Sequence, residues 1–289
     1  MAVFLPTDPE YTWMIAKMHH NMADASVHQS CTHLGFTHLV IESIAVCANR
    51  NLSPSHPIHR LLAPHHLYVI AINSRALAKL VAPGGWVDKC MHIGHVGMYD
   101  AEEKLKNDYE LQAWVQEMTA PPPEGFGIKG VPGGGLFSST GEIVEAVTSM
   151  IFISSVGHAA SNFPQYDEYA FPTNYPAMLQ GEIPRSKVPI NQSQPQGEEL
   201  SEKSVLDQLP DKQTTLDIMV VTKLLSERGT NTLTEFEIKY QYDSTGETAV
   251  NEFRKELIKI AGIITEGNKT RDSPYPYLDP REVSNAISI

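Results

Sequence analysis

The sequence predicts a mainly α protein. Apolar residues recur at helical spacing along several long segments, residues that favour helix starts precede these segments, and stretches rich in proline and glycine separate them. The chain has 289 residues, which is enough for one large domain or two modest ones with a sizeable core. We find no internal repeat.

The first third of the chain contains three expected helices. One should follow Asp8, whose carboxylate can cap it, and a second should follow Asp24 and end near Arg50. A third pattern covers residues 58–81 and should kink at Pro64, because proline lacks the N–H that an inner helical turn requires.

The middle of the chain alternates between helix and loop. Residues 101–118 have a solvated helical pattern, and residues 121–135 are a loop by their proline and glycine content. Ser139 and Glu142 form a capping box, which predicts an apolar helix that Pro164 stops.

The last third should be an extended loop, two helices and a tail. Residues 164–212 are rich in polar residues and proline, residues 216–227 have a helical pattern, and Ser244 can cap a further helix. An apolar stripe marks that last helix: Val250, Phe253, Leu257, Ile260 and Ile264. The final residues contain three prolines, so the tail should not be helical.

Charge and cysteine usage exclude some classes of partner. The formal net charge of −12 argues against nucleic acid and against an anionic membrane surface as main partners. A weak peripheral membrane contact stays open as a further interaction. The cysteines are odd in number and have no CxxC spacing: Cys31, Cys47 and Cys90. We therefore expect reduced thiols and a cytoplasmic protein. The N-terminus lacks a signal-peptide pattern, and no uninterrupted run of apolar residues is long enough to predict a transmembrane segment.

Histidines at regular spacing are the strongest functional signal. His28, His33 and His38 are five residues apart, and His158 and Asn162 are four apart. The i, i+4 pair shares one helical face, whereas an i, i+5 pair on an ideal helix is about 140° apart. A π-type widening of the helix would bring His33 and His38 to one side.

These residues suit a metal that prefers nitrogen and oxygen ligands, such as non-heme iron. Three imidazoles, the Asn162 amide and the carboxylate of the last residue, Ile289, could form such a site. The alternative is structural: single helical histidines are usually packed and hydrogen-bonded, Asn162 can end a helix, and an apolar tail can be ordinary core.

Several motifs in the same order resemble the catalytic domain of lipoxygenases, especially the animal type. The matching segments are WMIAK (13–17), the histidines at 28, 33 and 38, HP (56–57), LLAPHHLYVIAIN (61–73), HAASNFPQYDEY (158–169) and YLDPREVSNAISI (277–289). The resemblance implies a partial lipoxygenase catalytic domain over residues 1–289, with long helices around a metal site. It also implies that the family's N-terminal β-barrel domain and the first part of its catalytic domain are absent.

The resemblance assigns roles residue by residue. It implies one iron per chain, held by His33, His38, His158, Asn162 and the Ile289 carboxylate. Around these ligands it places His28, Gln29, His56, His65 and Gln165. Leu80 matches a leucine that packs over the reacting carbons, and Ala76 matches a position that tracks product stereochemistry, here predicting S products.

The implied activity is that of a dioxygenase. An iron-bound hydroxide, and no protein side chain, would take hydrogen from a cis,cis-1,4-pentadiene of a polyunsaturated fatty acid, and O2 would add to the carbon radical. The product would be a lipid hydroperoxide. Outer partners would orient the imidazoles, and an apolar pocket would hold the acyl chain.

The chain also departs from the family pattern. The resemblance implies that several tens of family residues are missing between Trp86 and Asp108, and Leu77 stands where the family has an arginine that could bind a fatty-acid carboxylate. We therefore expect low activity from this chain alone. Two alternatives stay open: a catalytically silent iron-binding or partner-binding fragment, and a lipid hydroperoxide isomerase.

Overall fold

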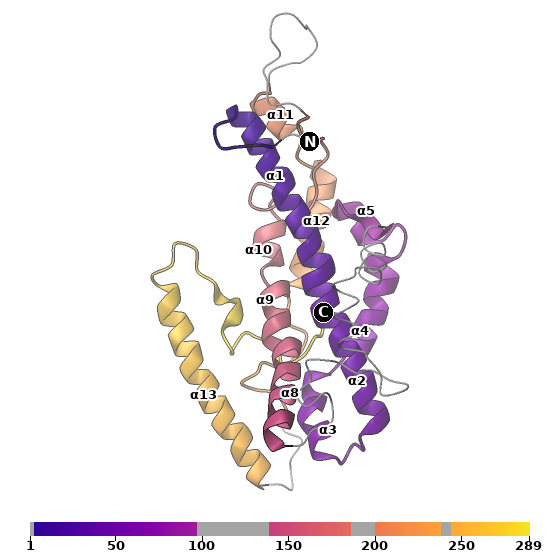
Figure 1. The fold of residues 1–289 in the computed structure, drawn as a ribbon, viewed down its shortest axis with the longest axis vertical. Helices are drawn as coiled ribbons and strands as arrows, with labels where there is room; N and C mark the ends of the chain where they lie inside the picture. The colour runs from indigo at the N-terminus through magenta and orange to yellow at the C-terminus, as the bar shows by residue number, and fades with distance from the viewer. Residues whose placement is uncertain (1–2, 97–138, 186–199, 238–243) are drawn as a thin grey trace, which may run out of the picture.

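The computed structural model confirms a mainly α protein (Figure 1). It describes residues 3–96, 139–185, 200–237 and 244–289. Within these ranges the regular structure is helical, and the β contact is an isolated antiparallel bridge between Thr232 and Ser284. The helix expected over 101–118 and the loop expected over 121–135 lie outside the described residues.

The first helical run is unbroken from residue 10 to residue 51. It consists of α1 (Glu10–Val27), the π-helix η1 (His28–Leu39) and α2 (Val40–Asn51). The predicted break at Asp24 is therefore wrong. The Asp24 carboxylate accepts a hydrogen bond from the hydroxyl of Tyr175 and does not cap a new helix.

The predicted helix over 58–81 is divided and not merely kinked. The chain forms α3 (Pro57–Leu62), a 3₁₀ turn η2 (Ala63–His65), α4 (Val69–Ala76) and the π-helix η3 (Leu77–Val81). Between η2 and α4, Tyr68 adopts a left-handed backbone with φ of 70°, which a continuous α-helix does not allow. A short helix α5 (Trp86–Cys90) follows.

The second long run carries the predicted capping box. Ser139 accepts a hydrogen bond from the Glu142 backbone, and Glu142 accepts one from the Ser139 backbone. The run consists of α8 (Thr140–Phe152), the π-helix η5 (Ile153–Gly157) and α9 (His158–Asn162). The run ends before Phe163 and Pro164, and α10 (Gln165–Tyr169) follows.

The two helices expected in the C-terminal part of the chain are present. The elements are α11 (Glu202–Leu206), α12 (Lys212–Leu225), α13 (Ser244–Asn268) and a 3₁₀ turn η6 (Pro276–Leu278). The short helices α10 and α11 fall within 164–212, and the rest of the described part of that stretch is mostly without regular helix, as predicted. On the predicted stripe of α13, Val250 and Leu257 are buried, whereas Phe253 and Ile260 are exposed.

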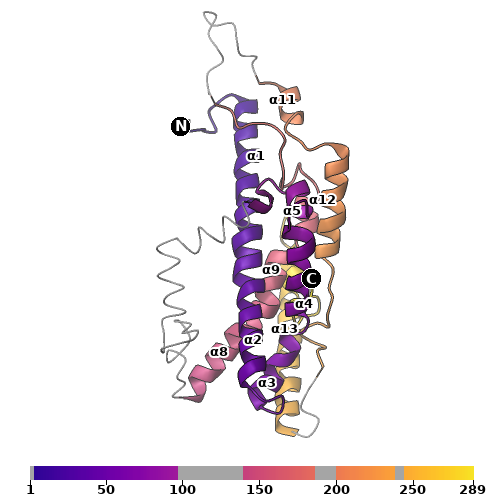
Figure 2. The ribbon, with the colours of Figure 1, turned by 90° about the vertical axis from the view of Figure 1, so that its right-hand side faces the viewer.

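The two long runs meet at the middle of the molecule. Figures 1 and 2 both show α9 beside the stretch where α1 passes into α2, and α9 contacts η1 there. The tail reaches the same region: Ile287 is fully buried in one cluster with Ile41, Ala45 and Val69. This packing brings η1, α9 and the C-terminus together.

The two long helical runs also bear on membrane-spanning length. Two helical runs among the described residues, Glu10–Asn51 and Thr140–Tyr169, are long and apolar enough to cross a membrane by length and composition. Core helices meet the same criterion, and these two runs pack on each other around buried polar side chains.

Candidate metal centre

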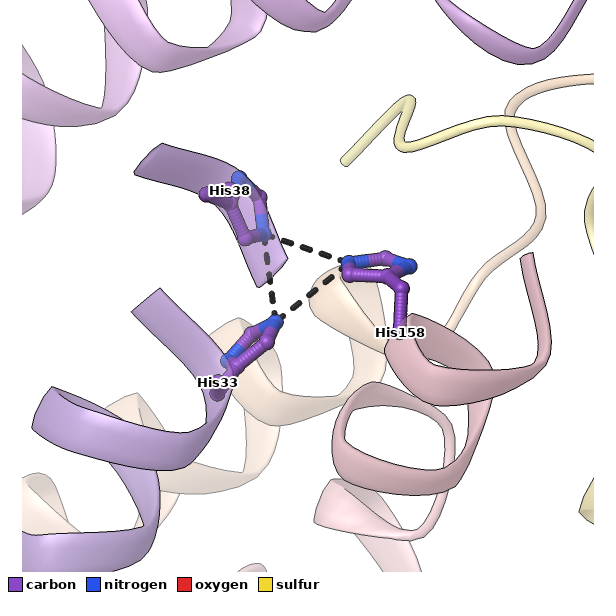
Figure 3. A group of neighbouring side chains, drawn as sticks. All are labelled: His33, His38 and His158. Carbon is purple, nitrogen blue, oxygen red and sulfur yellow. Dashed lines mark hydrogen bonds between the residues drawn. The ribbon is translucent and has the colours of Figure 1, made fainter. Parts of the chain in front are cut away.

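Three imidazoles from two separate helical runs converge on one point. Figure 3 shows His33 and His38 from η1 facing His158 from α9. The Nε2 atom of His38 lies 3.2 Å from those of His33 and His158, which are 3.4 Å apart. The predicted π-type widening is confirmed, and it is what places two side chains five residues apart on one side of a helix.

Burial keeps these imidazoles neutral. His33, His38 and His158 are 7%, 5% and 2% exposed. Burial lowers the pKa of His38 to about 4, and burial together with the neighbouring histidines lowers the pKa values of His33 and His158 well below the usual range. A neutral imidazole has one ring nitrogen with a lone pair, which is the form that binds a metal.

A chain of amide hydrogen bonds fixes the proton of His33. The backbone carbonyl of Leu225 can only accept, so it orients the Asn162 amide, whose Nδ2 donates to it at 2.6 Å. Asn162 Oδ1 then accepts from Gln165 Nε2 at 2.7 Å, and Gln165 Oε1 accepts from Gln29 Nε2 at 3.0 Å. Gln29 Oε1 must therefore accept at 2.9 Å from His33 Nδ1–H, which leaves His33 Nε2 unprotonated.

Asn73 fixes the proton of His38 in the same way. Its Nδ2 donates to the His38 carbonyl at 3.1 Å and to the Glu42 carboxylate at 2.7 Å. Its Oδ1 consequently accepts from His38 Nδ1–H at 2.8 Å. The Nε2 lone pair of His38 is then directed at the other two imidazoles.

This arrangement fits a bound cation. Two unprotonated Nε2 atoms, of His33 and His38, face each other at 3.2 Å, so they cannot hydrogen-bond to each other and their lone pairs repel. The buried Nδ1 of His158 also lacks a hydrogen-bond partner among the described residues. A metal at the centre of the three Nε2 atoms would turn this repulsion into coordination, and neutral imidazole is a good ligand for iron.

The C-terminal tail is held at the same place. His65 is 2% exposed and its Nδ1–H donates to the Asn285 carbonyl at 2.8 Å, while Asn285 Nδ2 donates to the Pro64 carbonyl at 2.7 Å. Beyond this anchor, the last residue, Ile289, lines the same cavity as His33 and His38. His65 thus positions the tail that the sequence predicts to supply a ligand.

The cavity beside the imidazoles is small and mostly apolar. Ala76 and Leu80, the two predicted pocket residues, line it together with Trp86 and Met91. Its volume is about 70 Å³, whereas ligand pockets usually exceed roughly 300 Å³. This space suits one or two water-sized molecules but not an acyl chain.

Comparison with known proteins agrees with the geometry. The family model described as "Lipoxygenase" matches residues 2–99 and 95–274. This chain belongs to the lipoxygenase family. The two matched parts meet within the stretch where the sequence indicates missing lipoxygenase residues.

The relatives are longer proteins. Hydroperoxide isomerase ALOXE3 of Mus musculus is 28% identical over 99% of this chain and 47% of its own length. Polyunsaturated fatty acid lipoxygenase ALOX15B of Rattus norvegicus is 28% identical over 99% of this chain and 49% of its own length. The chain therefore spans about half the length of the curated lipoxygenases it matches.

Solved lipoxygenases share the fold. A calcium-dependent 11R-lipoxygenase is similar with a TM-score of 0.81 and 26% identity, over 100% of this chain and 50% of that one. A lipoxygenase in complex with arachidonate has a TM-score of 0.79 and 27% identity, over 99% of this chain and 50% of that one. The helical architecture is that of lipoxygenase catalytic domains.

The other lipoxygenase-like positions are not all at the centre. The described contacts of the Asn162 amide are with Gln165 and Leu225 and not with an imidazole, although its oxygen keeps a second lone pair. His28 is the first residue of η1, five residues before His33, and its Nδ1 forms a hydrogen bond with the Tyr169 hydroxyl. His56 is exposed, and its Nδ1 accepts from the Ile58 backbone and caps α3, so its observed contact serves the helix.

Three residues that support the imidazoles are not among those predicted from the sequence. Asn73 and Glu42 fix His38, and the Leu225 carbonyl anchors the amide chain to His33. Glu42 carried a usable signal, because it lies four residues after His38 on one helix. Asn73 and Leu225 come close to the imidazoles and to Asn162 only through the tertiary fold.

Proposed function

We propose that this chain carries the iron centre of a lipoxygenase that adds O2 to polyunsaturated fatty acids with a cis,cis-1,4-pentadiene, giving lipid hydroperoxides. The observation that carries this proposal is the convergence of three neutral Nε2 atoms on one point, with Ile289 lining the adjoining cavity. The names of several relatives, including ALOX15B, describe polyunsaturated fatty acid lipoxygenases.

Iron would be held by the Nε2 atoms of His33, His38 and His158, with Asn162 and the Ile289 carboxylate completing the set. When bound, iron supplies the one-electron oxidation that breaks the weak C–H bond between two double bonds. The ligand set has a single negative charge, which favours an oxidising iron. The Gln29–Gln165 chain holds the His33 ring, and Ala76 and Leu80 form the adjoining apolar wall.

Two observations favour other functions for the same site. Hydroperoxide isomerase ALOXE3 is among the relatives, so the iron could instead rearrange a hydroperoxide without taking up oxygen. The small cavity favours a catalytically silent iron-binding chain. The three functions differ in oxygen uptake and in hydroperoxide consumption.

The test begins with the metal. Purified protein reconstituted with ferrous iron is analysed for iron content beside His33→Ala and His158→Ala, with His20→Ala as the control on an exposed face of α1. We expect near-complete loss of iron in the first two variants and none in the control. Full iron content in both would refute the site.

The activity is then measured on the iron-loaded protein. Oxygen uptake and conjugated hydroperoxide formation from linoleate or arachidonate support the dioxygenase. Consumption of added hydroperoxide without oxygen uptake supports the isomerase. Iron binding without either reaction would refute both enzymatic functions and support the silent chain.

A further inference from the structure

We propose that Glu42 and Asn73 are positioning residues that make His38 the most electron-rich of the three imidazoles. The inference rests on the proposed metal site and adds a carboxylate that acts on it from outside the ligand set. Glu42 reaches the His38 ring only through the Asn73 amide, so neither residue would touch the metal.

The geometry of this contact leaves one assignment. Asn73 is 2% exposed, and its amide forms three hydrogen bonds: two donated to oxygen acceptors at 2.7 and 3.1 Å, and one accepted from His38 Nδ1–H at 2.8 Å. A flipped amide would point its oxygen at the Glu42 carboxylate and at the His38 carbonyl, where no donor is available. The proton on Nδ1 is therefore set by the pair and not by the metal.

The three imidazoles have unequal outer partners. The relay behind His38 ends on a carboxylate, whereas the relay behind His33 ends on the neutral carbonyl of Leu225. The Nδ1 of His158 has no hydrogen-bond partner among the described residues. A negative charge behind an amide polarises it, strengthens its hydrogen bond to the ring and raises the basicity of the opposite nitrogen.

The Asn73 amide also links the proposed metal site to the residues that line the cavity. Glu42 lies on α2, one helical turn after His38, and Asn73 lies on α4. α4 passes directly into η3, so the helix that carries Asn73 also presents Ala76 and Leu80 to the cavity. A shift of Asn73 would move both the ligand and the wall.

The experiment separates the charge of Glu42 from its shape. Glu42→Gln keeps the length of the side chain and an oxygen that can accept from Asn73, but it removes the negative charge. Glu145→Gln, on the exposed side of α8, is the charge-matched control. Each protein is titrated with Co²⁺ alone, and after iron loading its ferric–ferrous midpoint potential is measured.

We expect Glu42→Gln to bind Co²⁺ about tenfold more weakly, at the lower end of the effect of outer partners on metal affinity. We also expect a higher midpoint potential, because loss of a nearby negative charge disfavours ferric iron. Asn73→Ala should weaken binding further, by roughly a hundredfold. A purely structural role for Glu42 would leave the potential unchanged.

The two proposals fail in different ways. If wild-type protein binds Co²⁺ and iron while Glu42→Gln equals it in affinity and potential, this inference is wrong and the metal site stands. If wild-type protein binds neither metal, the proposed function itself is wrong. Should Asn73→Ala fail to fold, Glu42→Gln and its control still decide the question.

Discussion

Backbone carbonyls determine which ring nitrogens of His33 and His38 carry no proton. The Leu225 carbonyl orients Asn162, Gln165 and Gln29 in turn, and the His38 carbonyl helps to orient Asn73. Because a carbonyl cannot donate, each relay has one direction and ends with a proton on Nδ1 of a histidine. The Nε2 atoms of His33 and His38 are thus left unprotonated by the protein's own hydrogen bonds.

Gly229 offers a test of how closely the tail must pack. A Cβ built there would lie 2.8 Å from the Ser288 hydroxyl oxygen and 3.0 Å from the Ser288 carbonyl oxygen, next to Ile289. We expect Gly229→Ala to displace the tail, to cost about 1–3 kcal/mol in the free energy of unfolding and to weaken iron binding. Denaturant unfolding and iron titration are the measurements.

Gly262→Ala is the matched control for Gly229→Ala. Gly262 lies in α13, where an added Cβ meets nothing within 4 Å, so alanine should leave iron binding unchanged and stabilise the helix by up to about 1 kcal/mol. If Gly229→Ala binds iron as tightly as this control, the tail does not need its observed packing.

The sequence predicts the three imidazoles of the site better than it predicts the residues that hydrogen-bond to them. The spacing of His33 and His38, together with the motif at His158, brings the three rings into one site, as the structure has them. Asn73 could not be found by spacing, because its contact with His38 spans 35 residues and depends on how α4 packs on α2. His56 matched a family interval and yet caps a helix at the surface.

At the scale of helices, every π-helix among the described residues adjoins the site. η1 carries His33 and His38, η3 carries Leu80, and η5 ends directly before His158. A π segment adds a residue to a helical turn and so turns the following helix relative to the preceding one. The widened turns orient the side chains that regular helices would turn away.

Deletion of Gly35 tests this role of η1. Removing one residue would turn α2 by about 100° relative to α1, so Ile41 and Ala45 could not stay buried while α1 keeps its own buried face. We expect loss of iron binding and a lower melting temperature. Deletion of Gly267, in the last turn of α13, is the control and should change neither by much. Equal behaviour of the two deletions would show that the extra residue of η1 does not orient α2.

Helix boundaries were predicted well where local capping decides them and poorly where tertiary contacts do. The Ser139–Glu142 box begins α8 as expected. Asp24 has the same kind of local signal, but Ala25 is fully buried beside Tyr169 and Ala177, and that packing favours a continuous helix. The left-handed turn at Tyr68 has no signal in the sequence, since left-handed backbone normally favours glycine.

For the molecule as a whole, a metal would join parts of the chain that are far apart in sequence. η1, α9 and the tail meet at the imidazoles, and Asn73 adds α4. Since the site forms only in the folded state, metal binding should stabilise the fold. At a free metal concentration of 100 times Kd the gain should be about 2.7 kcal/mol.

Denaturant unfolding with and without added Co²⁺ measures this linkage. We expect the wild-type midpoint to rise with metal concentration and the midpoint of His158→Ala to stay constant. A metal-dependent rise of equal size in both proteins would place the stabilising ion elsewhere on the chain.

The central claim is that His33, His38, His158 and the Ile289 carboxylate hold one iron ion. Anomalous diffraction at the iron absorption edge, on crystals of iron-loaded protein, tests it most directly. We expect one peak between the three Nε2 atoms, within coordination distance of each and of the terminal carboxylate. A peak at any other group of residues, or none in protein shown to contain iron, would contradict it.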